Sequence, residues 1–124
     1  MNKPTLTRKQ LGAIGEGFAF DYLQQQEYRI MERNWRCRTG EIDIVAEYEG
    51  LLIIIEVRTR SGSLNFGTAE ESVDLRKQQK VRETAQYYTL KHRKQDMQVR
   101  FDVISVLATK DGTRISIDHI PNAF

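Results

Sequence analysis

The sequence offers little that could cross-link the chain or bind a soft metal. Cys37 is its single cysteine, which excludes an internal disulfide and a zinc site built on thiolates. The two histidines, His92 and His119, lack the local spacing of metal ligands, and we expect structural roles for them. The sequence therefore gives no indication of a metal site based on cysteines or on paired histidines.

Long apolar stretches are also missing. The longest run covers residues 51–55, far short of the roughly 20 residues that cross a bilayer. The basic N-terminal residues are not followed by an apolar stretch of signal-peptide length. We therefore expect a cytoplasmic protein that does not enter the membrane.

The chain shows no repeat, low-complexity segment or interdomain linker. Its composition, 40% apolar and 29% charged, suits one globular domain over residues 1–124. The formal net charge is only +2, but arginines cluster around two acidic motifs and favour a phosphate-bearing partner. Those before the first motif are Arg29, Arg33, Arg36 and Arg38, and those after the second are Arg58 and Arg60.

Hydrophobic periodicity predicts two helices and five strands. The helices are expected over 7–26 and 74–92, with Ser72 or Asp74 as the N-cap of the second. The strands are expected over 28–35, 40–48, 51–60, 99–107 and 114–120, with turns at Glu49-Gly50 and Asp111-Gly112. Residues 51–57 are apolar on both faces, which predicts a central strand. This order, α-β-β-β-α-β-β, indicates an α/β fold with a mixed central sheet flanked by helices.

Glu56 directly follows the aliphatic run of the most apolar strand. An ionised carboxylate buried without a partner costs several kcal/mol. Arg58 lies on the same face of an alternating strand and could supply that partner. One interpretation is therefore an interaction protein with a structural Glu56–Arg58 network.

Two further carboxylates are expected on the face that carries Glu56. Alternation along 40–48 places Asp43 and Val45 on one face, opposite Ile42, Ile44 and Ala46. The apolar arc of the first helix contains Glu16. Three carboxylates at one place repel one another.

A hard divalent cation, Mg²⁺ or Mn²⁺, would resolve this repulsion, because carboxylates and water are its preferred ligands. Taken singly, Asp43 could be an exposed strand residue and Glu16 a charge at the helix margin. Glu41 has the weaker case as a ligand, since it opens its strand beside Gly40. The three periodicity arguments together predict an acidic metal site.

Several motifs carry a family resemblance. They are Gly15-Glu16, Arg33-Asn34, Gly40-Glu41-Ile42-Asp43, Glu56-Val57-Arg58, Lys77, Phe101-Asp102-Val103 and the C-terminal residues 120–124. With them the sequence resembles the YraN-like family of small bacterial proteins over nearly the whole chain. That family looks like a member of the PD-(D/E)xK nuclease superfamily, which includes archaeal Holliday-junction resolvases. The resemblance implies a single restriction-endonuclease-like domain.

The resemblance also implies roles for individual residues. Asp43 and Glu56 match the two acidic residues of the nuclease motif, and Glu16 matches a glutamate on the N-terminal helix. Arg58 stands where the motif has lysine. It could grip a phosphate through paired donors, but it cannot act as a base, because a guanidinium group stays protonated in proteins. Lys77, on the inward stripe of the second helix, is the expected substitute.

We therefore expect phosphodiester hydrolysis with Mg²⁺ or Mn²⁺ held by Asp43, Glu56, the Val57 carbonyl and Glu16. Contacts to the nucleic-acid backbone, DNA more than RNA, are expected from Arg36, Arg38, Arg60 and the loop 61–68. A homodimer is expected by analogy with resolvases. The alternative is a non-catalytic nucleic-acid-binding module on the same scaffold.

Overall fold

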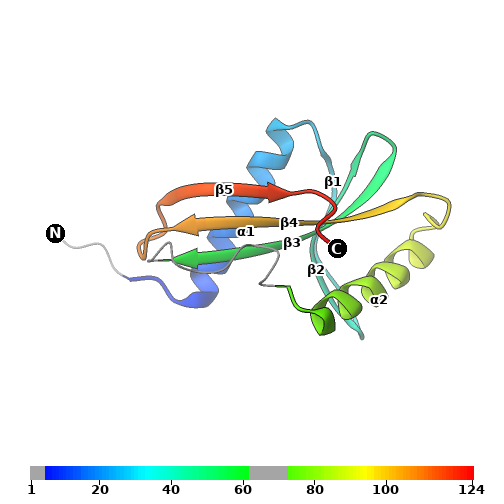
Figure 1. The fold of residues 1–124 in the computed structure, drawn as a ribbon, viewed down its shortest axis with the longest axis horizontal. Helices are drawn as coiled ribbons and strands as arrows, with labels where there is room; N and C mark the ends of the chain where they lie inside the picture. The colour runs from blue at the N-terminus through cyan, green and yellow to red at the C-terminus, as the bar shows by residue number, and fades with distance from the viewer. Residues whose placement is uncertain (1–4, 62–72) are drawn as a thin grey trace.

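The computed structural model describes residues 5–61 and 73–124. Within these ranges the chain forms two helices and five strands in the predicted order, which confirms the α/β class (Figure 1). The elements are α1 (Arg8–Gln25), β1 (Arg29–Cys37), β2 (Gly40–Tyr48), β3 (Leu51–Ser61), α2 (Leu75–Lys91), β4 (Val99–Ala108) and β5 (Arg114–Ile120). Ser61 ends β3, whereas residues 62–68 of the predicted loop and the N-cap candidate Ser72 lie outside the described residues.

The described strands form one mixed sheet in the order β1-β2-β3-β4-β5. β2 is antiparallel to both β1 and β3, β3 and β4 are parallel, and β5 returns antiparallel to β4. Glu49 (φ 50°) and Gly50 (φ 79°) form the tight turn between β2 and β3, with both residues in the left-handed region that such hairpins need. β3 is therefore the central strand, as its apolar faces predicted.

The two helices cover opposite faces of the sheet (Figure 1). On one face, Ala19 and Leu23 of α1 pack against Ile53 and Ile55. On the other, α2 packs against a cluster that includes Leu52 and Ile54 through residues Val81, Ala85 and Tyr88. In the described part of the chain, neither helix is long and apolar enough to cross a membrane.

Side-chain caps fix where each helix begins. The Thr7 hydroxyl accepts a hydrogen bond from the Gln10 amide, and the Gln10 side chain accepts one from the Thr7 amide, which completes a capping box. Asp74 caps α2, because its Oδ1 accepts from the Lys77 amide at 2.8 Å. These caps set the rotation of the turns that carry Glu16 and Lys77.

The strict alternation predicted for β2 is wrong near its start. Ile44 and Ala46 pack beneath α1, but Ile42 packs in the cluster beneath α2. The pairing of β2 with β3 ends at Ile44 and Ile55, while β2 stays paired with β1 and β3 with β4. We call this separation, between residues 40–43 of β2 and 56–61 of β3, the strand fork. Figure 1 shows β2 turning away from β3 there.

Candidate active site

Asp43 lies at the strand fork and replaces the missing strand partner of β3. Its Oδ2 accepts a hydrogen bond from the Val57 amide at 2.8 Å. The N–H and C=O of one strand residue point to the same edge, so the Val57 carbonyl faces the fork as well. Burial raises the pKa of Asp43, although the Val57 hydrogen bond and the charge of Lys77 act against the rise. Asp43 is thus held at the fork by backbone.

Glu16 reaches the fork from α1. It shares a hydrogen bond with Asp43, and burial together with the Asp43 charge raises its pKa to about 7. When the Asn34 amide nitrogen faces the carboxylates, it lies 3.0 Å from Glu16 Oε1 and 3.1 Å from Glu41 Oε1. Near neutral pH the Glu16–Asp43 pair therefore holds a proton between its carboxyl groups for part of the time.

Glu56 is the most deeply buried of the three acids, with 3% of its surface exposed. Its Oε2 lies 3.6 Å from the Lys77 Nζ. Its Oε1 is buried and has no hydrogen-bond partner among the described residues. Burial, and next the charge of Asp43, raises the pKa of Glu56 to about 7, while Lys77 and Arg58 act to lower it.

The prediction that all three carboxylates share one sheet face is wrong. Glu56 faces α2, because side chains alternate along β3 and Leu52 and Ile54 already pack on that side. Glu16 approaches from the face covered by α1. Asp43 lies between them at the strand fork, where its charge acts on both. The three acids therefore approach one another from both faces of the sheet, at the edge of β3 that the strand fork leaves open.

Two cations predicted for the site lie beside Glu56. Lys77, in the first turn of α2, makes the ion pair already described. Arg58 contributes a positive charge that lowers the pKa of Glu56. The positive charges of Lys77 and Arg58 therefore both act on the Glu56 carboxyl group.

The arginines predicted to bind nucleic acid are spread over two regions. Arg36 pairs with Glu41 at 3.3 Å, and Arg38 donates to the Tyr87 hydroxyl at 2.8 Å. Arg60 lies elsewhere, at the end of β3, and lines two hollows of about 250 and 360 Å³.

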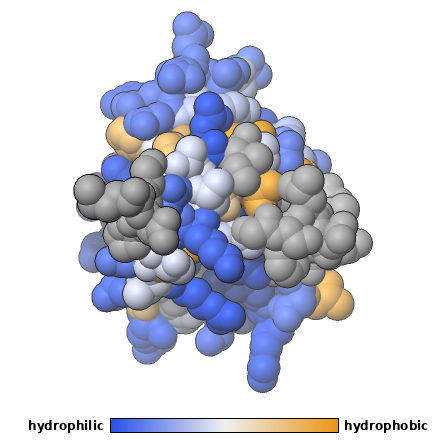
Figure 2. Space-filling model, turned by 90° about the vertical axis from the view of Figure 1, so that its left-hand side faces the viewer, coloured by the Kyte–Doolittle hydropathy of each residue, from blue (hydrophilic) through white to orange (hydrophobic). Residues whose placement is uncertain are grey.

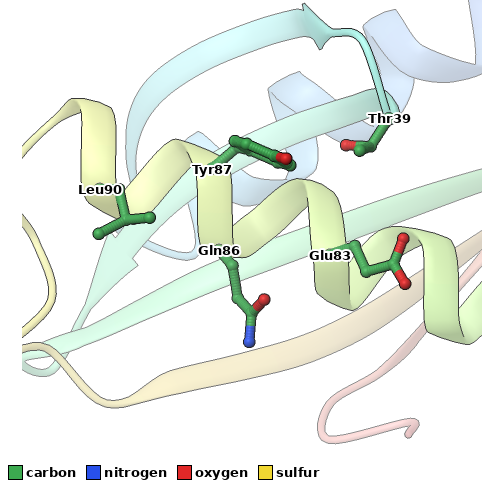
Figure 3. A pocket seen from close by; sticks show the side chains of 5 residues that line it. All are labelled: Thr39, Glu83, Gln86, Tyr87 and Leu90. Carbon is green, nitrogen blue, oxygen red and sulfur yellow. The ribbon is translucent and has the colours of Figure 1, made fainter.

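A third hollow lies beside Tyr87 (Figure 3). It has a volume of about 320 Å³ and is lined by Thr39, Glu83, Gln86, Tyr87 and Leu90. Figure 3 shows that four of these side chains come from α2 and that Thr39 faces Tyr87 across it. None of the predicted catalytic residues lines this hollow.

Two residues matter more than the sequence indicated. Asn34 adopts a left-handed backbone conformation (φ 53°) and can donate to Glu16 and Glu41. The charge of Glu41 adds to the rise in pKa of Glu16 and Asp43. The two residues come together because β1 pairs with β2, a pairing that the sequence does not specify residue by residue.

The oxygen donors at the strand fork suit a hard cation, but their present positions do not form a complete metal-binding site. Carboxylate oxygens and a strand carbonyl are donors that Mg²⁺ and Mn²⁺ prefer, and the unpartnered Oε1 of Glu56 is an available one. Among the residues described, no group of three or more acidic, histidine or cysteine side chains is close enough to hold a metal ion. Cation binding would therefore require loss of the proton shared by Glu16 and Asp43 and a rearrangement of these side chains.

Comparison with known proteins gives a consistent family match. The model of the uncharacterised protein family UPF0102 matches residues 15–106. A UPF0102 protein of Persephonella marina is 48% identical over 91% of this chain and 91% of its own length. One from Desulforamulus reducens is 48% identical over 96% of this chain and 98% of its own length. One from Caldanaerobacter subterraneus is 39% identical over 96% of this chain and 98% of its own length.

Proposed function

The chain belongs to the UPF0102 family, the YraN-like family that its motifs resemble, and from this membership and the site we propose that it is a metal-dependent nuclease. It would hydrolyse phosphodiester bonds in nucleic acid, with DNA, including branched DNA, as the favoured substrate. A cytoplasmic location and a homodimer belong to the same proposal.

The observation that carries the proposal is the state of Glu56. A carboxyl group that is 3% exposed keeps one oxygen without a hydrogen-bond partner in residues 5–61 and 73–124, although a buried polar atom is normally satisfied. Asp43 lies close enough for its charge to raise the pKa of Glu56. A structural ion pair would instead leave both carboxylate oxygens satisfied. The arrangement is thus costly for a structural role and suited to a ligand.

Asp43, Glu56, the Val57 carbonyl and Glu16 would hold Mg²⁺ or Mn²⁺. The cation would neutralise charge on the phosphate and lower the pKa of the attacking water. The Val57 N–H holds Asp43 in place, and Asn34 orients Glu16. The metal ligands are therefore supported by two hydrogen-bond donors, the Val57 N–H and the Asn34 amide, which would not themselves bind the metal.

Lys77 and Arg58 would act on the substrate. Lys77, once displaced from Glu56, can position water or stabilise charge on the phosphate. Arg58 offers a bidentate grip on phosphate oxygens. Their closeness to Glu56 supports these roles.

The test is cleavage of linear DNA, branched DNA and RNA with Mn²⁺. Asp43→Asn keeps an acceptor for the Val57 amide, and Glu56→Gln keeps the side-chain shape. Both should lower cleavage at least about 100-fold, whereas Asp21→Asn, at an exposed position of α1, should leave it unchanged. Equal activity in all four proteins would assign the cleavage to a contaminant. Isothermal titration with Mn²⁺ should show binding to the wild type and none to Glu56→Gln.

A non-catalytic nucleic-acid-binding module is the second candidate. Arginine in place of the motif lysine favours it, as does the absence of a ready metal cage among the described residues. This candidate predicts salt-dependent binding without turnover, even in Arg58→Lys. Turnover by the wild type that is lost in Glu56→Gln would eliminate it.

A further inference from the structure

We propose that Arg8 and Arg60 form a phosphate-binding site that extends the active site along β3 to the first turn of α1. The ligand is a backbone phosphate of the bound nucleic acid, several nucleotides from the bond that is cleaved. This inference rests on the proposed function, because it takes the ligand to be a nucleic acid.

The site is a pair of adjoining hollows at the end of β3. One, of about 360 Å³, is lined by Arg8, Leu11, Thr59, Arg60 and Ser61. The other, of about 250 Å³, is lined by Val57, Arg58, Thr59 and Arg60. They share Thr59 and Arg60, so together they lead from the strand fork to the start of α1. Figure 2 looks onto this end of the molecule, where the described atoms in view are mostly hydrophilic.

A close helix contact brings Arg8 to this place. A Cβ built on Gly15 would lie 1.8 Å from the Thr59 hydroxyl, so α1 crosses β3 at a distance that only glycine permits. Arg8 lies two helical turns before Gly15, and this contact places it beside the end of β3. Leu11, which is buried, forms an apolar wall between them.

The lining groups suit a phosphodiester. Two guanidinium groups can each grip phosphate oxygens through paired donors. The hydroxyls of Thr59 and Ser61 are further donors of the kind that commonly contact nucleic-acid backbones. No acidic side chain lines either hollow in the part of the chain described. The guanidinium and hydroxyl donors that line the hollows therefore suit an anion.

The first turn of α1 supplies an independent argument. It contains Arg8 and Lys9 but no acidic residue, although cations are unfavourable at the positive end of the helix dipole. Arg8 is also exposed and makes no compensating contact with an acid in the pairs found among the described residues. A bound phosphate would turn this unfavourable placement into a favourable one.

The register along β3 sets the position of the phosphate. Arg60 lies four residues after Glu56, or about 13 Å along an extended strand. That span corresponds to about four base pairs of duplex at its usual axial rise. Arg8 and Arg60 should therefore contact substrate that extends at least that far on one side of the cleaved bond.

The test measures binding of labelled DNA by the full chain in EDTA over a range of salt concentrations. Arg8→Ala should weaken binding several-fold and lower the salt slope by about one. The matched control, Lys91→Ala at the exposed C-terminal turn of α2, should change neither. Arg8→Ala removes a cation that opposes the helix dipole, so its Tm should not fall. Wild-type affinity and slope in Arg8→Ala would overturn the inference.

Cleavage with Mn²⁺ separates this inference from the proposed function. Cleavage that needs Asp43 and Glu56 but is indifferent to Arg8 on long substrates would overturn the inference alone. Arg8-dependent binding without cleavage would overturn the nuclease and support the phosphate site. An Arg8→Ala defect that disappears on substrates truncated on one side would support both.

Discussion

Glu56 is the residue on which most of the site depends. Its position after five buried or half-buried aliphatic residues shields it from water. Within the described part of the chain, Lys77 pairs with one of its oxygens and the other has no hydrogen-bond partner. The strand therefore stores an unfavourable charge at neutral pH. Replacing that charge with an amide of the same shape should relieve it.

We predict that Glu56→Gln raises stability at pH 8 in the absence of divalent cations. The gain should be about 1 kcal/mol, or about 4 °C in Tm, because the variant no longer buries a charge near Asp43. At pH 5 the difference should disappear, since the pKa of Glu56 is about 7 and the wild-type group is then neutral. Thermal unfolding at both pH values checks this, with the exposed Asp21→Asn as control. A Tm loss at pH 8 would contradict it.

We also predict that Lys77→Met shifts the pH dependence of Mn²⁺ binding to higher pH. Lys77 lowers the pKa of both Glu56 and Asp43, so its removal makes these carboxyl groups harder to ionise. Titration with Mn²⁺ between pH 6 and 9 measures the shift. Lys77→Arg keeps the charge and should behave as the wild type; an unchanged profile in Lys77→Met would mean that Lys77 does not act on the ligands.

At the scale of elements, the contact between α1 and β3 positions Glu16. Gly15 permits that contact, because its missing Cβ leaves room for Thr59. The neighbouring Gly12 has open space around the position of a Cβ. The two glycines on one helix therefore form a matched pair.

Gly15→Ala should destabilise the protein by about 1–3 kcal/mol through overpacking. Gly12→Ala should stabilise it by up to about 1 kcal/mol through helix propensity. Denaturant unfolding of the two variants measures both signs. Since α1 must move away from β3, Gly15→Ala should also weaken Mn²⁺ binding. Equal effects of the two substitutions would show that the contact is not tight.

The sequence was sufficient to predict the helices and strands, but not which face of the sheet each side chain occupies. Periodicity and caps located both helices, and Asp74 acts as the predicted N-cap. Alternation failed at Ile42 because it assumes that a strand stays paired, and the residues of β2 before Ile44 are not paired with β3. For the same reason the prediction grouped Glu16, Asp43 and Glu56 at one place but wrongly put all three on one face of the sheet. Arg8 was missed because its neighbour Arg60 is distant in sequence and close only in the fold.

At the scale of the whole molecule, the site makes stability depend on pH. Glu16 and Glu56 have pKa values of about 7 in the folded chain, against 4.5 for an ordinary glutamate. Between these values the folded state binds more protons than the unfolded state, so stability decreases as pH rises. The contribution is complete below about pH 4.5 and is lost as the pH rises through about 7.

We therefore predict that Tm falls between pH 5 and 8 without divalent cations, and that the double variant Glu16→Gln, Glu56→Gln falls less. Mn²⁺ should raise the wild-type Tm, with an effect that grows with pH because ligands must lose protons to bind. Differential scanning calorimetry in both conditions checks the two trends. A wild-type Tm that falls no more than that of the double variant over this range in EDTA would contradict the raised pKa values of the two carboxyl groups.

The hydrogen bond from the Val57 amide to Asp43 has a practical consequence. Most amides of the sheet donate to backbone carbonyls of a neighbouring strand, but this one donates to an ionisable side chain. The ¹H and ¹⁵N chemical shifts of the Val57 amide should therefore change when Asp43 gains or loses a proton and when a cation binds at the strand fork. The protein carries its own spectroscopic reporter, and a single isotope-labelled sample suffices to observe it.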